Sequence, residues 1–333
     1  MTRPTADIRS RGPARGGAGL RVGIVGGGIA GALLGRRLAA AGARVTVYTA
    51  RGLPPDATAV SGGLVRGFET DLERCRLAAD SLAELRADPA LAAAAGYREL
   101  GSAYLLASDP AVEVLAKEID ARLPGSVSVI DPPWSAVPAG AVAVFERQAG
   151  YLSPAALRGW ALAGLPVEPA PPDPLSVAGR VDALVLATGR WTPALLAAAG
   201  LPGLGLRTKA IQYALHRARG WIPPVFVDEL TGLWVRPAAG DQVLLGVPSA
   251  RWDPVGPAPE PDLVAAAARA AYQRFGVDVG EPVAVVTAAD AYADPPVLAL
   301  RPVADGIFTF TGGSGGAAKY ALAASRVAAA ALA

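Results

Sequence analysis

The sequence has few of the residues that carry metal, disulfide or nucleic-acid chemistry. Its 333 residues include one cysteine, Cys75, and one histidine, His216. These counts exclude an internal disulfide and leave no metal-binding cluster. Arginine and lysine number 31 against 29 acidic residues, a net charge of +2, which disfavours nucleic acid as a partner. We expect Cys75 to be a buried thiol and His216 a hydrogen-bonded core residue.

Long apolar runs are also missing. No stretch reaches the roughly 20 residues of a membrane span, so no membrane association is expected. The first nineteen residues are polar and basic and lack the apolar segment of a signal peptide. We therefore expect residues 1–19 to form a disordered basic tail and the protein to be cytoplasmic. Lysine is rare, and composition does not explain its use at Lys117, Lys209 and Lys319.

Residues 20–51 have the pattern of a strand, a glycine-rich turn, a helix and a second strand. The turn is a G-x-G-x-x-G sequence made by Gly26, Gly28 and Gly31. In a dinucleotide-binding unit these glycines make the tight turn, admit the pyrophosphate to the backbone and let the helix pack on the strand. The pyrophosphate then lies at the helix N-terminus. The sequence therefore predicts a dinucleotide site here.

The second strand ends without the acidic residue that binds the adenosine ribose in such sites. The residues at this point are Thr49, Ala50 and Arg51. A threonine followed by an arginine would suit the 2′-phosphate of NADP. This motif alone therefore does not choose between the dinucleotide cofactors.

Later segments predict further parts of the same sheet. The apolar run 181–187 ends at Thr188 and Gly189, and such a strand end places backbone beside a ligand. Residues 306–311 predict a strand, 312–316 a glycine turn, and the rest a helix to the C-terminus. The chain thus begins and ends with a strand, a glycine turn and a helix, and one sheet is expected to hold both. Residues 71–91 have helical spacing.

The order of these motifs resembles the D-amino-acid oxidase family of flavoproteins, which includes glycine oxidase and monomeric sarcosine oxidase. The resemblance covers nearly the whole chain after residue 20. Besides the first motif, it rests on SGGLVR (61–66), ELGSAYLLAS (99–108), GYLSPAAL (150–157), ALVLATGRWTPAL (183–195), LWVRPAAGDQVLLG (233–246), YADPPVLAL (292–300) and IFTFTGGSGGAAKYALA (307–323).

The resemblance implies an α/β fold with two domains. A Rossmann-like FAD-binding domain would be assembled from residues 20–92, 148–205 and 284–333. A substrate domain of α+β character, built on a mixed sheet, would come from 93–147 and 206–283.

The resemblance also implies a set of FAD-binding residues: Gly26, Gly28, Ile29, Ala30, Gly31, Thr49, Ala50, Arg51, Ser61, Gly62, Gly63, Leu64, Val167, Thr188, Gly189, Trp191, Gly313, Ser314, Gly315, Gly316 and Ala317. Lys319 matches a lysine that holds the substrate carboxylate in sarcosine oxidases, and Arg66 is expected over the flavin ring. These two are the expected catalytic residues. The expected pocket residues are Tyr104, Trp234, Arg236, Asp290 and Tyr292.

Four positions depart from the family pattern. The arginine that grips a carboxylate in glycine and D-amino-acid oxidases falls at Ala289, followed by Asp290, and a second carboxylate arginine falls at Glu69. The lysine that assists oxygen activation falls at Leu244, and the cysteine that tethers the flavin falls at Thr287. We therefore expect non-covalent FAD. An acidic Asp290 or Glu69 in the pocket would suit a cationic or hydroxylated substrate.

The sequence thus predicts an FAD-dependent oxidoreductase that oxidises the C–N bond of an amine or amino-acid-like small molecule by hydride transfer. We expect a monomer or homodimer. The alternatives are an NADPH-dependent flavin monooxygenase, an NADP-dependent dehydrogenase and a flavin-binding protein that has lost its activity. The monooxygenase is disfavoured because its usual G-D-A-x-H run near the C-terminal glycine turn is missing. The dehydrogenase leaves the later glycine turns unexplained.

Overall fold

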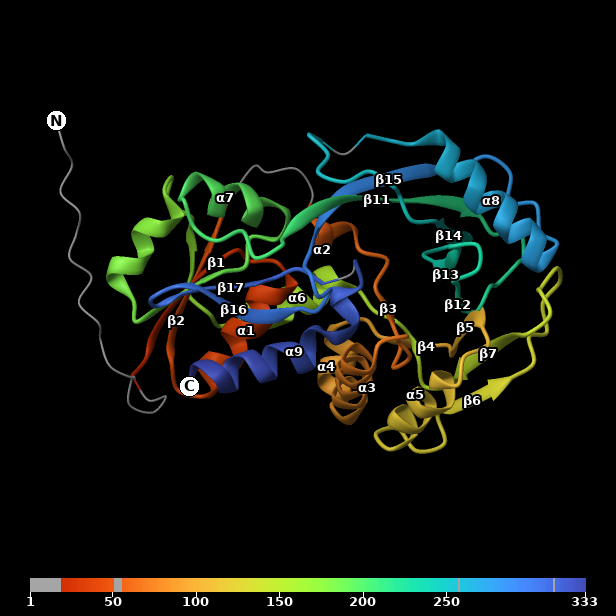
Figure 1. The fold of residues 1–333 in the computed structure, drawn as a ribbon, viewed down its shortest axis with the longest axis horizontal. Coiled ribbons are helices and arrows are strands. Elements are labelled where there is room, and N and C mark those ends of the chain that lie inside the picture. The colour runs from red at the N-terminus through yellow and green to blue at the C-terminus, as the bar shows by residue number, and fades with distance from the viewer. Residues whose placement is uncertain (1–18, 51–55, 257, 314) are drawn as a thin grey trace.

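The computed structural model describes residues 19–50, 56–256, 258–313 and 315–333. The expected tail, apart from its last residue, lies outside the described part of the chain, as do Arg51 and Ser314. Two large sheets dominate the fold (Figure 1). The expected α/β class is confirmed, with a Rossmann-like sheet and a mixed second sheet.

The first sheet has six strands in the order β16-β17-β10-β1-β2-β9. Five of them run parallel, and β16 is antiparallel to β17. The strands are β1 (Arg21–Val25), β2 (Arg44–Thr49), β9 (Val167–Pro169), β10 (Ala183–Leu186), β16 (Ala299–Ala304) and β17 (Ile307–Thr311). The first and the last strand–turn–helix units of the chain therefore lie in one sheet, as expected.

The second sheet has eight strands in the order β15-β11-β14-β13-β12-β5-β7-β6. Its neighbours are antiparallel except β12 and β5. The strands are β5 (Ser102–Ala107), β6 (Val127–Ile130), β7 (Ala141–Glu146), β11 (Arg207–Arg217), β12 (Val225–Asp228), β13 (Trp234–Ala238), β14 (Gln242–Gly246) and β15 (Ala284–Tyr292). A small third sheet joins β3 (Leu64–Val65), β8 (Gly150–Tyr151) and β4 (Arg98–Glu99).

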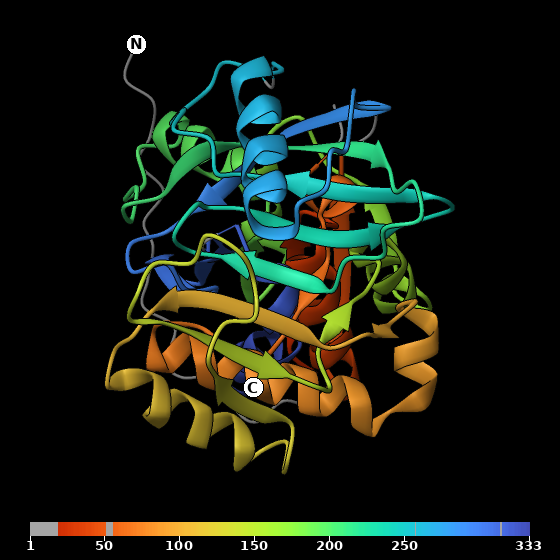
Figure 2. The ribbon, with the colours of Figure 1, turned by 90° about the vertical axis from the view of Figure 1, so that its right-hand side faces the viewer.

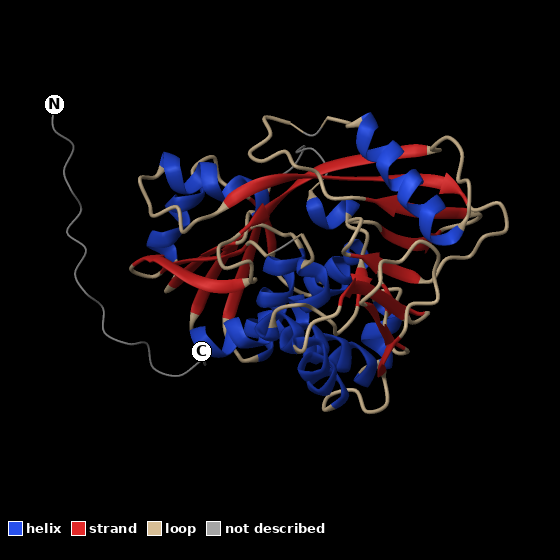
Figure 3. Ribbon diagram, turned by 45° about the vertical axis from the view of Figure 1, so that its right-hand side comes forward, coloured by secondary structure: helices blue, strands red, loops and turns tan. Residues whose placement is uncertain are grey.

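Most helices gather on one side of the two sheets (Figure 3). The helices are α1 (Ile29–Ala40), α2 (Ala57–Val60), α3 (Leu72–Ala87), α4 (Pro89–Ala94), α5 (Ala111–Asp120), α6 (Pro154–Leu162), α7 (Thr192–Ala198), α8 (Pro261–Phe275) and α9 (Ala317–Leu332), with 3-10 turns at Pro174–Arg180 and Gly189–Trp191. Apolar residues of α1 and α9 share one core with β1 and β2. Helix α8 covers the outer face of the eight-stranded sheet (Figure 2).

The helix expected over residues 71–91 is in fact two helices. Helix α3 ends at Ala87, and α4 begins at Pro89. The Asp88 side chain accepts a hydrogen bond from the Leu91 backbone N–H at 2.9 Å and caps α4. An aspartate followed by proline is a favoured helix start, because proline fits the first helical position and the residue before it avoids the helical region.

Strands β11 and β15 pair over nine residues, from Arg207 opposite Tyr292 to Leu215 opposite Ala284. Figure 1 shows them running together along the top of the molecule. Strand β15 thus belongs to the eight-stranded sheet, although residues 284–333 were expected to lie in the FAD-binding domain. The division into two domains otherwise stays a prediction. Among the described helices, none combines the length and the apolar character needed to cross a membrane.

Candidate active site

Four strand ends meet at one edge of the six-stranded sheet. Val25 of β1 pairs with Tyr48 of β2 and with Leu186 of β10, and β10 pairs with β17 in turn. Because these strands are parallel, the turns at Gly26, Thr49, Thr188 and Gly312 follow at the same edge. Ligands of open α/β sheets bind at such carboxyl edges.

The first glycine turn has the geometry that its sequence predicts. Gly26 has φ of +114°, and a Cβ there would lie 2.2 Å from the Ala187 carbonyl oxygen. A Cβ on Gly31 would lie 2.1 Å from the Gly26 oxygen. Only glycine therefore lets α1 approach β1 this closely.

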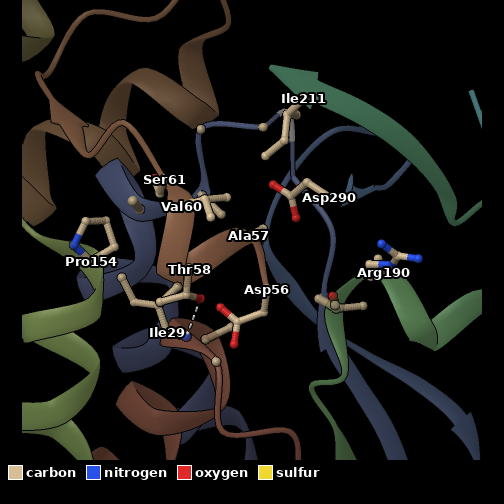
Figure 4. Close-up of a pocket in the computed structure, with 18 of the residues that line it drawn as sticks. Ile29, Asp56, Ala57, Thr58, Val60, Ser61, Pro154, Arg190, Ile211 and Asp290 are labelled. Carbon is tan, nitrogen blue, oxygen red and sulfur yellow. Dashed lines mark hydrogen bonds between the residues drawn. The ribbon is translucent and has the colours of Figure 1, made fainter. Parts of the chain in front are cut away.

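The N-terminus of α1 points its backbone donors at the cavity described below. Gly28 at the cap position has no capping side chain, and the Ile29 N–H instead donates to Thr58 Oγ1 at 3.1 Å (Figure 4). A helix N-terminus with free N–H groups carries partial positive charge and binds phosphate. Thr58 adds a hydroxyl at the same point, which the sequence analysis did not identify.

The C-terminal glycine turn approaches the same cavity. Gly312, Gly313 and Gly315 have φ of +89°, +135° and +75°, and α9 begins without a capping side chain. The Tyr292 hydroxyl lies against Gly315, where a Cβ would be 2.3 Å away. The described residues of this turn are glycines, which let a ligand approach the backbone closely.

One cavity of about 1360 Å³ joins these turns to the eight-stranded sheet. Typical small-molecule pockets measure about 300–1,000 Å³, so this one has room for a dinucleotide and a second small molecule. The expected FAD-binding residues on its wall are Gly26, Gly28, Ile29, Ala30, Thr49, Ala50, Ser61, Gly62, Gly63, Leu64, Thr188, Gly189, Trp191, Gly315, Gly316 and Ala317. The expected catalytic and pocket residues on its wall are Lys319, Arg66, Tyr104, Trp234, Asp290 and Tyr292.

Lys319 and Arg66 both form ion pairs with Glu69. Arg66 Nη2 lies 2.8 Å from Glu69 Oε1, and Lys319 Nζ contacts the same oxygen. Arg74 Nη1 approaches Glu69 Oε2 at 3.8 Å. The Lys319, Arg66 and Glu69 side chains are 6–8% exposed, and all line the cavity. We call Arg66, Glu69 and Lys319 the buried ion cluster.

Burial and charge set the pKa values of this cluster. Burial alone would raise the pKa of Glu69, but the positive charges of Lys319 and Arg66 outweigh it and lower that pKa. Burial and the nearby Arg66 lower the pKa of Lys319 to about 8, although Glu69 opposes them. Glu69 is therefore ionised at neutral pH, and Lys319 is mostly protonated there.

Asp290 is a further acidic group on the wall of the cavity. It lies near Ile211 and faces the α2 segment with Ala57 and Val60 (Figure 4). Its Oδ1 accepts a hydrogen bond from the Ala291 N–H at 2.8 Å, and it forms no ion pair within the described residues. Burial raises the pKa of Asp290 to about 6, and the charge of Asp56 adds to this. An acid held in this way is typical of functional sites.

Asp290→Asn is expected to change the pH dependence of stability. Because the folded-state pKa is above the ordinary 3.8, the folded protein binds more protons between pH 4 and 6 and loses stability as pH rises through that window. The variant lacks this loss, so relative to the wild type it should gain about 1–2 kcal/mol between pH 4 and 7. Denaturant unfolding of both proteins over this range measures the difference.

Asp253→Asn is a control whose stability relative to the wild type should change with pH in the opposite direction. The Thr208 N–H and the Arg207 guanidinium lower the pKa of Asp253, so its contribution to stability is present above pH 4 and is lost as pH falls. This variant should therefore lose stability relative to the wild type as pH rises. A pH-independent difference for Asp290→Asn would contradict the raised pKa.

Aromatic side chains form the walls near the buried ion cluster. The Arg66 guanidinium lies 4.9 Å from the centre of the Tyr104 ring. The Trp234 indole packs against Gly62 and Gly246, where an added Cβ would be 2.6 Å and 2.4 Å from the ring. Both aromatic rings are therefore fixed by their packing.

Among the described residues, four of the expected ones do not lie on the cavity wall. Arg236 donates hydrogen bonds to the carbonyl oxygens of Gly62 and Pro237, so it supports the 61–63 turn. Val167 is an exposed residue of edge strand β9, and the cavity instead reaches Ala170. Gly31 and Gly313 shape their turns from behind the wall.

Several cavity residues were not identified from the sequence. Arg158 Nη1 pairs with Asp56 Oδ2 at 2.9 Å, and both line the cavity beside α2. Lys209 also lines it, and its Nζ lies 5.1 Å from the centre of the Trp252 ring. The rarity of lysine was the available signal for Lys209. No local pattern signals the Arg158–Asp56 pair.

Cys75 and His216 lie in the protein core. The Cys75 thiol is buried, which raises its pKa to about 11. The His216 side chain is fully buried, and its Nδ1 lies 3.0 Å from the Gly280 carbonyl oxygen. Burial lowers the pKa of His216. Within the described ranges, no three or more histidine, cysteine or acidic residues are grouped as metal ligands.

Solved structures share this fold. L-proline dehydrogenase from P. horikoshii aligns with a TM-score of 0.75 and 16% identity, covering 94% of this chain and 92% of its own. Glycine oxidase from Geobacillus kaustophilus gives 0.70 and 20%, with 94% of each chain covered. Iminodiacetate oxidase from Chelativorans sp. BNC1 gives 0.68 and 17%, with 93% and 94% covered. At these identities the likeness establishes the fold alone.

Sequence comparison establishes the family. No curated protein matches the chain. The family model described as FAD dependent oxidoreductase (DAO) matches residues 21–331, which is nearly the whole chain. The glycine turns and the large cavity fit the FAD that this family uses, since they supply backbone donors and space at one sheet edge. The chain therefore belongs to the DAO family of FAD-dependent oxidoreductases and is an enzyme of that family.

Proposed function

We propose that this enzyme oxidises the C–N bond of a small amine to an imine, with FAD bound non-covalently. One observation carries the proposal: a single cavity is lined by the glycine turns at the sheet edge and by charged and aromatic side chains of the other elements. Titratable groups with shifted pKa values in a large cavity are typical of an active site. The related structures named as an iminodiacetate oxidase and a glycine oxidase support a substrate with a C–N bond.

In this proposal the FAD-binding residues divide by their position along the sheet edge. The backbone of residues 28–30 and the Thr58 hydroxyl would hold the diphosphate, as a helix N-terminus does. Thr49 and Ala50 would face the adenosine. The turns 61–64, 188–189 and 312–316 would contact the rest of the cofactor. Thr287 stands where a tethering cysteine would be, so no covalent bond to the cofactor is proposed.

The chemistry needs a hydride acceptor and a proton acceptor. FAD, when bound, supplies the two-electron acceptor for the hydride from the carbon that bears nitrogen. The nitrogen loses one proton to solvent, and hydrolysis of the imine then consumes one water and gives a carbonyl compound and an amine or ammonia. The protein orients the amine, and Trp234 and Tyr104 keep water away from the reacting carbon. The N-terminus of α9, Arg66 and Lys319 would hold positive charge beside a bound flavin, which gains negative charge on reduction.

The test is the visible spectrum of the purified protein. Wild-type protein should show a bound flavin, and amines added without air should bleach it. Release of the flavin on acid precipitation would support non-covalent binding. A colourless protein that does not take up FAD, or bleaching that requires NADPH, would contradict the proposal, and the second result would support a monooxygenase.

A further inference from the structure

The two cations of the buried ion cluster already hold a carboxylate of the protein itself. Lys319 and Arg66 reach the cavity from different elements, α9 and the segment after β3, and both contact Glu69 Oε1. Arginine and lysine that converge in a cavity are the usual ligands of a substrate carboxylate. In this chain a glutamate side chain takes that position.

Glu69 is not easily displaced from this position. It is 5% exposed, and its carboxylate is bracketed by Arg66, Lys319 and, at 3.8 Å, Arg74. Arg74 has a second partner, Asp71, at 3.6 Å. A substrate carboxylate would have to break these buried contacts and leave Glu69 without its partners, which is costly for a buried charge.

We infer that Glu69 is a specificity-determining residue that serves as a built-in carboxylate between Arg66 and Lys319. The substrate is therefore an amine that has no carboxylate on the carbon that is oxidised. The statement about the oxidised carbon rests on the proposed function. The assignment of Glu69 as the occupant of a carboxylate site stands on the ion pairs alone.

One further charge in the cavity agrees with this inference. Asp290 brings an acidic group with no ion pair among the described residues. The basic side chains of Lys209 and Arg190 also line the cavity, but each lies near an aromatic ring. Lys209 Nζ is 5.1 Å from the Trp252 ring centre, and Arg190 Cζ is 5.3 Å from that of Trp191. Asp290 is thus an acid that could pair with the amino group of a substrate.

Binding of acetate to Glu69 variants tests the inference directly. Glu69→Ala removes the built-in carboxylate and leaves space, and Glu69→Gln removes the charge and keeps the shape. Calorimetry and thermal unfolding with sodium acetate, compared with sodium chloride at equal ionic strength, should show about tenfold or tighter acetate binding in Glu69→Ala than in the wild type. Glu69→Gln should show a smaller gain. Glu73→Gln, an exposed acid on α3, should behave as the wild type.

Matched pairs of amine and amino acid test the consequence for the substrate. Phenethylamine should bleach the wild-type flavin more than about tenfold faster than phenylalanine at equal concentration, and Glu69→Ala should shift this ratio by about tenfold towards the amino acid. Faster bleaching by the amino acid in the wild type would overturn the inference.

Equal acetate affinity in the wild type and in Glu69→Ala would also overturn it. If Glu69→Ala does not fold, an unchanged acetate affinity in Glu69→Gln overturns it instead. Failure of every amine to bleach the flavin would count against the proposed function. The acetate result would still decide the assignment of Glu69, because it requires no turnover.

Discussion

Gly28→Ala is expected to weaken FAD binding by about tenfold or more while leaving the fold intact. The structure has room for the new methyl group, since the nearest atom to a Cβ at this position is Thr58 Oγ1 at 3.4 Å. The proposed diphosphate lies against the Gly28 backbone, so the methyl group would push it away from the α1 N-terminus. Titration of the apoprotein with FAD, followed by flavin fluorescence, measures the affinity.

Gly31→Ala is the matched variant, and it is expected to lower the stability of the apoprotein, which Gly28→Ala should leave intact. Its Cβ would lie 2.1 Å from the Gly26 oxygen and 3.0 Å from Ala187 Cβ, so α1 must move away from β1. The apoprotein itself should lose about 2 kcal/mol or more of unfolding free energy. If Gly28→Ala lowered the stability of the apoprotein as much as Gly31→Ala, the assignment of Gly28 to cofactor contact would be wrong.

Arg274→Met is expected to lower the unfolding free energy by about 3–5 kcal/mol. Arg274 Nε lies 2.6 Å from Asp228 Oδ2, and these side chains are 4% and 0% exposed. Removing the guanidinium leaves a buried carboxylate without its charge partner, and the Ser135 and Ala136 carbonyls lose a donor. Denaturant unfolding of wild type and variant measures the loss.

Arg207→Met is the control for this effect. Arg207 pairs with Asp253 at 2.8 Å, but the two side chains are 55% and 52% exposed, and such surface pairs contribute about 0–1 kcal/mol. Similar losses of unfolding free energy in both variants would show that burial does not make the Arg274–Asp228 pair more important for stability than the exposed pair. A loss below about 1 kcal/mol for Arg274→Met would contradict the prediction.

The turns at the carboxyl edge of the six-stranded sheet were predictable because their signals are local. Gly26, Gly28 and Gly31 are close in the sequence, and each is needed where the backbone turns tightly or is approached closely. The same holds for the strand ends at Thr188 and Gly312. The position of strand β15 was not predictable in this way, since its sheet is chosen by pairing with β11 over long sequence separation.

The partners of the charged side chains could not be predicted from the sequence either. Glu69 and Lys319 lie far apart in the sequence. Glu69 was identified as a departure from the family pattern, and Lys319 as a match to it. Their contact depends on how α9 packs against the segment after β3. Arg236 shows the same limit, because its strand was found but the direction of its guanidinium was set by the Gly62 carbonyl.

The long pairing of β11 with β15 has a consequence for how ligands enter. Strand β15 also contacts α2 and the 189–191 turn, so the eight-stranded sheet packs through β15 against elements near the carboxyl edge of the six-stranded sheet. A hinge motion that moved the eight-stranded sheet away from these elements would have to break the contacts of β15 with them. A ligand that enters the cavity without such a motion leaves these contacts of β15 intact.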